Sequence, residues 1–329
     1  MSASINYGFI LTLSSIKRNL FSIGGPILVI LGTIGSILSF SIFIQKHLRK
    51  NPCSIYFMAY NIASIGVIYG GLLPPVLELG YSIDYSIYNL DICRLRLYAA
   101  VSLGCICPSY LILASIDRVF ITSPKAHMRR LSSRRYAAIF IITGTLFWLL
   151  CSIPIGVFAA ILNPAPNYLI CLTQTNTYTR TISYGSLAKE ILVPSMMVFF
   201  GVWAVKNIHH MKLVRIAPTG SLHTTQRKTG TPMIQAKDRQ LVVLMLINII
   251  IYVPFSCVLP IVLLYTQLTA SQSESIETLQ SQDFLFRVAT YCVYVPYCIN
   301  SYAHLFMSKT FRKELKDIIL TGRLFPCCA

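Results

Sequence analysis

The stretch CRLRLYAAVSLGCICPSYLILASIDRV, residues 93–119, decides the fold. It begins with Cys93, continues through an uncharged run at 97–116, and closes with the triplet Asp117-Arg118-Val119. A helix needs about 20 apolar residues to span a bilayer, and this run reaches that length. The sequence therefore predicts a transmembrane helix with a thiol at one end and an opposite-charge pair at the other.

Similar runs recur along the whole chain. They lie at residues 21–44, 54–77, 136–180, 191–205, 241–268 and 288–307. The run at 191–205 is short, but it extends to 184 on one side and along an amphipathic stretch to 213 on the other. Charged residues make up 12% of the chain, about half the share of soluble domains. We expect an all-α membrane protein, a seven-transmembrane helix bundle over residues 21–308, in which the first run acts as a signal anchor.

The basic residues set the expected orientation of this bundle. Lys and Arg concentrate at 46–50, 118–135, 206–239 and 309–323, on one side of the membrane, and charges on the other side cancel. The side that carries the +17 formal charge should be cytoplasmic. Residues 1–20 are then an extracellular N-terminus, and 309–329 form an amphipathic helix and a cytoplasmic tail. The charge faces lipid headgroups, so membrane lipids are expected partners and nucleic acid is not.

Four cysteines have predicted roles. Cys93 and Cys171 are at the extracellular ends of the expected spans, in an oxidising compartment, so a disulfide between them is expected; the alternative is two free thiols. Cys327 and Cys328 follow the amphipathic stretch at 309–320 and are candidates for palmitoylation. The alternative for this second pair is two unmodified cytosolic thiols.

A set of residues in order along the chain carries a family resemblance. They are Cys93, Asp117-Arg118-Val119, Trp148, Cys171, Pro194, Cys257, Pro260, Asn300 and Phe311-Arg312-Lys313. On these residues the chain resembles the rhodopsin-like class of G-protein-coupled receptors over nearly its whole length. Residues 51–56 also look like a subset of invertebrate orphan and peptide-type receptors. The resemblance implies a plasma-membrane receptor that signals to a heterotrimeric G protein through Asp117, Arg118 and Val119. It implies no enzymatic activity.

The chain departs from the family at its internal switches. Ser36 and Ser64 stand where the family has Asn and a sodium-binding Asp, and Val258 replaces the helix-six Trp. The helix-seven motif reads Asn300-Ser301-Tyr302-Ala303-His304 in place of Asn-Pro-x-x-Tyr. A different internal relay is expected, and a non-signalling relative is the alternative. His304 can either titrate near neutral pH or pack at the helix end, and we favour packing.

The ligand class follows from residues near the outer ends of the helices. The neighbourhood 291–297 lacks the lysine that retinal needs, and Ala100 occupies the place of the aspartate that amine receptors use. A short peptide is the expected extracellular ligand. The candidate binding residues are Arg94, Arg96, Tyr98, Ala100, Lys189, Glu190, Gln267, Arg287, Tyr291 and Tyr294. The alternative is that Tyr and Arg here only anchor helix ends at the interface.

Other function classes are less favoured. No His cluster has metal-ligand spacing and no phosphate-binding or nucleophile motif occurs, so neither a cofactor nor an enzyme is expected. A transporter or channel normally needs acids inside the membrane, and the runs carry charge only at their ends. The loop at 208–236 should be flexible, and its hydroxyl residues Thr219, Ser221, Thr224, Thr225, Thr229 and Thr231 are candidate phosphorylation sites for arrestin recruitment.

Overall fold

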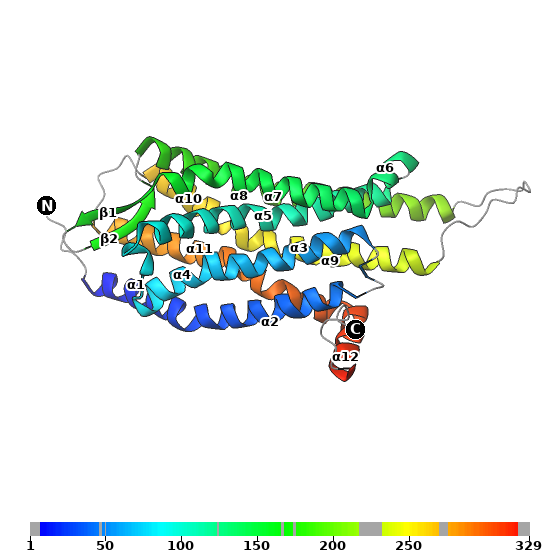
Figure 1. Cartoon of the computed structure of the whole chain (residues 1–329), viewed down its shortest axis with the longest axis horizontal. Coiled ribbons are helices and arrows are strands. Elements are labelled where there is room, and N and C mark those ends of the chain that lie inside the picture. The colour runs from blue at the N-terminus through cyan, green and yellow to red at the C-terminus, as the bar shows by residue number, and fades with distance from the viewer. Residues whose placement is uncertain are drawn as a thin grey trace, which may run out of the picture.

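A bundle of long helices dominates the computed structural model, which describes residues 7–45, 48–49, 51–123, 125–165, 168–173, 176–216, 232–269 and 276–321. The helices run side by side along the long axis of the molecule (Figure 1). A two-stranded sheet of β1 (Ala159–Ala165) and β2 (Tyr168–Thr173) lies at one end, here called the hairpin end. The helix α12 (Lys309–Thr321) lies at the opposite, α12 end and runs across the bundle axis.

The remaining elements follow in chain order. The first long helix consists of α1 (Tyr7–Asn19), the short π-helix η1 (Leu20–Gly24) and α2 (Gly25–Phe43). The second consists of α3 (Pro52–Val67), η2 (Ile68–Leu72), α4 (Leu73–Pro75) and η3 (Val76–Gly80). A short η4 (Tyr85–Ile87) precedes α5 (Leu90–Thr122), α6 (Ala126–Leu131) and α7 (Arg134–Val157). After the hairpin come α8 (Asn176–Ile216), α9 (Pro232–Ser256), α10 (Val258–Thr269) and α11 (Ile276–Met307).

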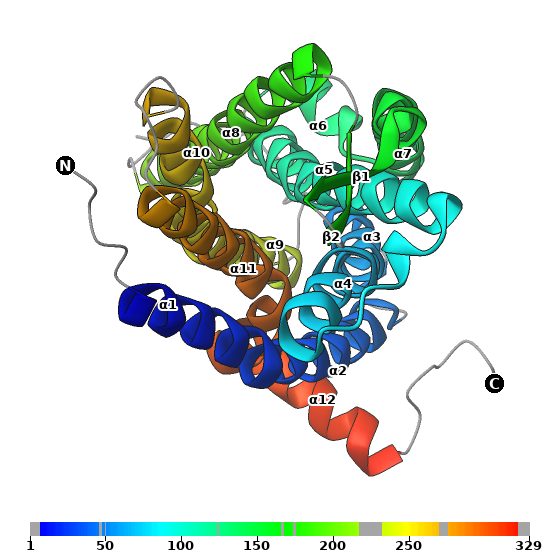
Figure 2. The same cartoon turned by 90° about the vertical axis from the view of Figure 1, so that its left-hand side faces the viewer.

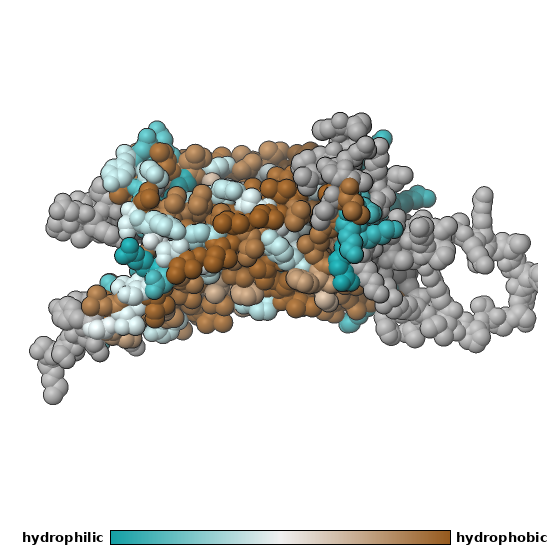
Figure 3. Space-filling view, turned by 90° about the horizontal axis from the view of Figure 1, so that it is seen from below, coloured by the Kyte–Doolittle hydropathy of each residue, from teal (hydrophilic) through white to brown (hydrophobic). Residues whose placement is uncertain are grey.

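Six helices in the described part of the chain are long and apolar enough to cross a membrane. They cover Gly8–Phe43, Pro52–Gly80, Leu90–Thr122, Arg134–Val157, Tyr184–Ile208 and Leu241–Thr269. On the face that Figure 3 shows, apolar side chains form a broad belt across the middle of the bundle, and hydrophilic residues gather toward its two ends. The chain is therefore a multi-pass, mainly helical membrane protein. Helix α11 packs against α2, α9 and α10 but falls outside the six.

Local capping explains where several helices begin. The Asn51 side chain accepts a hydrogen bond from the Cys53 amide at 3.0 Å, and Pro52 takes the first helical position, where its missing N–H costs nothing. The Asn89 side chain caps α5 in the same way, and the Ser133 side chain caps α7. These short polar residues satisfy backbone N–H groups that the first helical turn leaves unpaired.

Helix α5 lies at the centre of the packing, with α3, α7 and α8 against it. Looking along the axis, the other long helices surround a common interior (Figure 2). The first two long helices approach closely at Gly80, where an added Cβ atom would lie 2.9 Å from the backbone of Ser22. Only glycine fits at that contact. Helix α12 buries Phe311 and Ile318 against the bundle while Arg312 and Lys316 stay exposed, as a helix on a membrane surface requires.

The structure differs from the sequence expectations at four boundaries. The first helix begins at Tyr7, so most of residues 1–20 extend the first span. The run at 136–180 is not one helix, because α7 ends at Val157 and the β1–β2 hairpin follows, an element that the all-α expectation lacks. The sixth run is interrupted at Cys257, between Pro254 and Pro260, which remove backbone donors from the helical ladder. Helix α8 continues to Ile216 and α9 starts at Pro232, so the expected loop at 208–236 is shorter.

Candidate functional site

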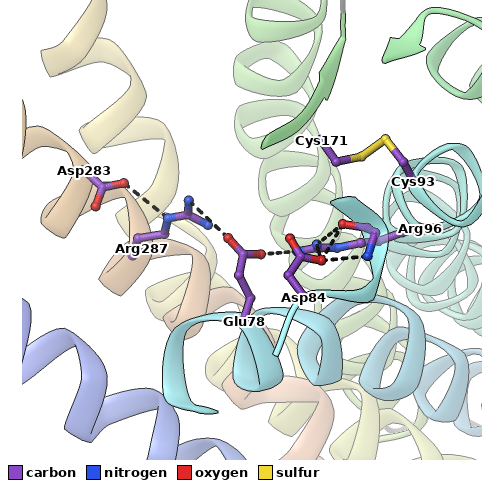
Figure 4. Close-up of polar contacts among 8 residues, drawn as sticks. Glu78, Asp84, Cys93, Arg96, Cys171, Asp283 and Arg287 are labelled. Carbon is purple, nitrogen blue, oxygen red and sulfur yellow. Dashed lines mark hydrogen bonds and ion pairs between the residues drawn. A yellow bond between two sulfur atoms is a disulfide. The ribbon is translucent and has the colours of Figure 1, made fainter. Parts of the chain in front are cut away.

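A disulfide joins Cys93 to Cys171 at the hairpin end, as the sequence predicts (Figure 4). Cys93 is fully buried in the first turn of α5, and Cys171 lies on β2 opposite Ile161 of β1. The two Cα atoms are 5.8 Å apart, within the usual range for a disulfide. The bond attaches the hairpin to the start of α5.

Arg96 forms the centre of a charged cluster beside this disulfide. Its guanidinium binds the Glu78 carboxylate of η3 and lies 3.2 Å from Asp84 Oδ1. It also donates a 2.8 Å hydrogen bond to the Ser86 hydroxyl. Asp84 itself caps η4 by accepting from the Ser86 amide at 2.9 Å. Arg96 therefore ties α5 to η3 and η4.

The cluster continues to α11 and α1. Arg287 Nη2 lies 3.9 Å from Glu78 Oε1, and Arg287 Nε lies 3.3 Å from Asp283 Oδ1. Lys17 Nζ donates a 2.6 Å hydrogen bond to Asp283 Oδ2. Burial favours the protonated form of Asp283, but the hydrogen bond and charge of Lys17, with those of Arg287, outweigh it and hold its pKa below the ordinary value.

We call these six residues, Lys17, Glu78, Asp84, Arg96, Asp283 and Arg287, the hairpin-end network. It holds three cations and three anions, so its net charge is zero. Its side chains keep between 18% and 38% of their surface exposed. Partly exposed charges of both signs at one end of a helix bundle are chemically suited to a zwitterionic ligand, whose own charges can exchange with the internal pairs.

The predicted ligand-binding residues lie in several separate places. Arg96 and Arg287 belong to the hairpin-end network, and Tyr294 lies next to it, packed against Gly71 of η2. Tyr291 stacks edge-on against Phe21 at a centroid distance of 5.4 Å, so it packs between α11 and the first helix.

The other candidates point elsewhere. Tyr98 donates to the Leu149 carbonyl at 3.2 Å and lines, with Arg94, a groove between α5 and α7. Ala100 is partly buried in α5, and Gln267 is exposed on α10. The structure therefore does not bring Tyr98 or Gln267 into the network, because Tyr98 faces α7 and Gln267 is exposed on α10. Ala100 follows Arg96 by one turn on the same face of α5, but its methyl group offers no polar contact.

Glu190 and Lys189 correct the expectation of a charge-free interior. Glu190 is 2% exposed, and its Oε1 lies 2.5 Å from Lys189 Nζ. Both residues belong to α8, inside the candidate span Tyr184–Ile208. The sequence places them at a span end because the uncharged run starts at 191, whereas the helix begins earlier. An ion pair thus lies within the apolar belt.

Arg118 occupies a buried site toward the α12 end of α5. Its side chain is 0% exposed, and its Nη2 donates to Asp117 Oδ2 at 2.7 Å and to Asn51 Oδ1 at 2.8 Å. Asp117 Oδ1 accepts a 2.6 Å hydrogen bond from the Ser132 hydroxyl. Val119 is buried beside them. We call Asp117, Arg118, Asn51 and Ser132 the arginine centre.

The sequence alone does not predict that two residues, Asn51 and Ser132, belong to the arginine centre. Asn51 caps α3 and at the same time accepts from Arg118, and Ser132 follows α6. A signal for Asn51 exists, since Asn before Pro marks a helix start near the same membrane face. No local pattern indicates Ser132. The expected pair of opposite charges formed by the neighbours Asp117 and Arg118 agrees with the geometry.

The predicted helix-seven residues line a polar cluster in the core. His304 is buried, with Nε2 2.8 Å from Asn248 Nδ2 of α9. Its ring lies edge-on to Phe43, Phe57 and Phe311. His304 therefore packs at the helix end, the reading favoured from the sequence, and it also links α11 to α9.

Asn300 and Ser301 occupy the same region. Asn300 Nδ2 donates to the Tyr60 hydroxyl at 2.9 Å, and Ser301 packs beside Gly35. Ser64, a position singled out in the sequence, is buried with its hydroxyl 3.4 Å from Cys107 Sγ. Among the described residues, no group of three His, Cys, Asp or Glu side chains is arranged to hold a metal ion.

Several predicted sites lie outside the described residues. They are the lipidation candidates Cys327 and Cys328 and the phosphorylation candidates between 219 and 231. Comparison with known proteins adds no further constraint: neither a scan against protein-family models nor a search of curated proteins finds a match to this chain.

Proposed function

We propose that the chain is a plasma-membrane receptor that passes an extracellular signal, carried by a short peptide, to heterotrimeric G proteins. In this proposal it is a divergent member of the rhodopsin-like class. The observation that carries the proposal is the arginine centre, where a fully buried arginine next to an acid ends the central helix α5.

The proposal needs α11 as a seventh span. At about 1.5 Å per residue its 32 residues reach about 48 Å, longer than a bilayer core. Its second half carries Tyr297, Asn300 and His304, which lower its mean hydropathy but are buried against other helices. Polar groups turned toward the bundle interior are compatible with a membrane span.

Orientation in this proposal follows the basic residues. Arg129, Arg130, Arg312, Lys313 and Lys316 are exposed on α6 and α12. These two helices lie at the α12 end (Figure 1). By the positive-inside rule this end faces the cytoplasm and the hairpin end faces outward. The disulfide then lies in the oxidising compartment and the arginine centre at the face where a G protein binds.

The contacts of the arginine centre allow Arg118 to exchange one hydrogen-bond partner for another. Asp117 neutralises Arg118 within one helix, so the charge stays compensated if α3 moves away. The contact with Asn51 is a single hydrogen bond to a neutral side chain. Such a bond across membrane helices contributes only about 0.6 kcal/mol on average. Arg118 can therefore exchange Asn51 for a group on a G protein at small cost.

The hairpin-end network supports a peptide as ligand. A peptide brings an ammonium, a carboxylate and side chains of both signs, and the network offers Arg96, Arg287 and Glu78 with part of their surface exposed. Tyr294 adds an aromatic surface beside Gly71. Because a peptide carries charges of both signs, it can form ion pairs with these residues without leaving any of their charges unpaired.

The test expresses the chain with promiscuous G proteins and screens a peptide library for signalling. A hit is then repeated with Arg118→Gln, which removes the charge but keeps polar reach toward Asp117 and Asn51. The matched control is Arg129→Gln, an exposed arginine on α6. We expect Arg118→Gln to abolish signalling at unchanged surface expression and peptide binding, and Arg129→Gln to signal normally. Normal signalling in Arg118→Gln would refute the assigned role. If the signalling screen gives no hit, a library peptide that binds the surface-expressed chain without signalling would indicate a non-signalling relative.

A transporter is the second candidate, favoured by the ion pair of Lys189 and Glu190 within the apolar belt and by the break at Cys257 between α9 and α10. Acids and interrupted helices inside a membrane are typical of transport proteins. Its test reconstitutes the chain in liposomes and measures proton or sodium flux under a gradient. Flux that Glu190→Gln abolishes would favour transport over the receptor proposal.

A further inference from the structure

A large groove opens between α8 and the pair α9 and α10. Its volume is about 1110 Å³, and it lies within the candidate spans Tyr184–Ile208 and Leu241–Thr269. Most of its wall is apolar, as shown by Val198, Phe199, Val202, Trp203, Ile261 and Leu264. These side chains are also exposed on the outside of the bundle. In a membrane the groove therefore faces lipid tails, and its occupant arrives from the bilayer.

Three polar side chains also line the groove: Glu190, Ser195 and Lys206. Glu190 is the acid among them, and Lys206 lies sixteen residues further along α8, about 24 Å away along the helix. Its Oε1 pairs with Lys189, while its Oε2 is buried and has no hydrogen-bond partner within the described chain. A buried carboxylate oxygen that lacks a donor is costly, since nothing replaces the water it loses. The groove thus combines a hydrocarbon surface with one strong acceptor at its wall, and a ligand that supplies a donor there gains most.

Charge decides what kind of donor fits. Lys189 and Glu190 together are neutral, so a cationic ligand would leave a net positive charge and an anionic one a net negative charge inside the apolar belt. Unbalanced charge at that depth is expensive. The donor should therefore be uncharged, and a hydroxyl group is the simplest such donor in a lipid.

Depth and shape narrow the ligand further. Glu190 lies six residues inside the start of its span at Tyr184, about 9 Å along the helix. A lipid that keeps its hydroxyl near the interface can reach that depth. Below it the wall presents the rings of Phe199 and Trp203, whose centroids are 5.7 Å apart. Aromatic rings packed edge to face suit a rigid apolar body better than a mobile acyl chain, since a rigid ligand loses less entropy on binding.

We propose that this groove binds a membrane sterol, whose single hydroxyl donates a hydrogen bond to Glu190 Oε2 and whose ring system packs against α8 and α10. The site is separate from the arginine centre and does not depend on G-protein coupling.

The experiment uses the full chain reconstituted in phosphatidylcholine nanodiscs with a photoreactive cholesterol that carries a diazirine. After irradiation, labelled peptides are mapped by mass spectrometry. We expect labels on residues 187–203 and 253–264. Unlabelled cholesterol at matched mole fraction should compete, whereas 5-cholestene, which lacks the hydroxyl, should compete about tenfold less well, in line with the strength of a hydrogen bond to a charged group.

Two variants separate the groove from general lipid contact. Val198→Trp fills the groove from its lipid-facing wall without touching the buried pair, and should reduce labelling about tenfold. The matched control is Ile142→Trp, an exposed position on α7 outside the groove, which should label as the parent does. The double variant Lys189→Leu, Glu190→Leu removes both charges together and should make cholesterol and 5-cholestene equal competitors.

Three results would overturn the proposal. They are labels spread evenly over all helices, equal competition by 5-cholestene in the parent chain, and unchanged labelling in Val198→Trp. The last uses a substitution at a lipid-facing position, so it stays informative even where the double variant fails to fold.

Discussion

The two charged regions of this protein are built on opposite principles. At the hairpin end, six partly exposed ions pair across helices, from Lys17 on α1 through Asp283 on α11 to Arg96 on α5. At the α12 end, Asp117 and Arg118 are adjacent in one helix and almost fully buried. The first region joins helices through charge, whereas the second keeps its charge within one helix and joins others through neutral groups.

This difference has a mechanical consequence. Separating helices at the hairpin end would break ion pairs and also strain the disulfide attachment of the hairpin. Separating α3 from α5 at the α12 end breaks the hydrogen bond between Asn51 and Arg118 and leaves the ion pair intact. The hairpin end is therefore the clamped end of the bundle and the α12 end the adjustable one, which is the distribution that a receptor with an inward-facing output requires.

The largest effect is expected from Asp117→Ala. It leaves Arg118 buried beside the neutral Asn51 side chain without its carboxylate partner, and removing one partner of a buried pair costs about 3–5 kcal/mol. The parallel variant Glu78→Ala in the network should cost no more than about 1 kcal/mol, because its partners keep access to water. Thermal unfolding of both in detergent gives the comparison, and an equal or larger loss in Glu78→Ala would reverse it.

The disulfide is the next largest contribution at the hairpin end. Replacing Cys93 and Cys171 together by serine should lower the free energy of unfolding by about 2–4 kcal/mol, because their bond closes a long loop. Hydrogen exchange should then accelerate in residues 159–173. The control is Cys151→Ser, an exposed free thiol on α7, which should leave both measurements unchanged. Unaltered exchange in the double variant would show that other contacts hold the hairpin.

A smaller effect is expected at the core link between α9 and α11. A double-mutant cycle with Asn248→Leu and His304→Leu should give a coupling energy of about 0.6 kcal/mol, with about 1.7 kcal/mol as the upper bound for such bonds in membranes. Thermal denaturation of the four proteins supplies the cycle. Additive losses would mean that the 2.8 Å contact contributes nothing beyond packing.

The smallest effect concerns pH at the network. The folded-state pKa of Asp283 is lowered from its ordinary value of 3.8, so its contribution to stability is fully present above that value and is lost as pH falls through the folded pKa. Its side chain is 38% exposed, so solvent screening keeps the contribution below about 1 kcal/mol. Unfolding measured between about pH 5 and 2 should show a shallower acid loss of stability in Asp283→Asn than in the parent chain. Identical profiles would remove Asp283 from the acid response.

Much of the architecture is readable from residue order. Each of the six candidate spans overlaps an uncharged run, because a bilayer demands a length of apolar helix that the chain must supply locally. The disulfide partners follow from their common outer location, and α12 follows from the helical spacing of Phe311, Leu315 and Ile318. The ends of the segments are harder to predict from the sequence. Lys17 and Glu190 both belong to helices that carry candidate spans, and each forms an ion pair there.

The contact partners of the charged residues, in contrast, cannot be predicted from residue order. Asn51 and Ser132 at Arg118, Glu78 and Asp84 at Arg96, and the groove at Glu190 all come from chain segments that meet only after the helices pack. The periodicity of each helix sets which residues are apolar, but the rotation and tilt that bring two polar faces together depend on side-chain packing between helices. Composition and spacing therefore specify a membrane helix bundle and its disulfide. Only the packing of the helices forms the hairpin-end network, the arginine centre and the groove with its acceptor, Glu190.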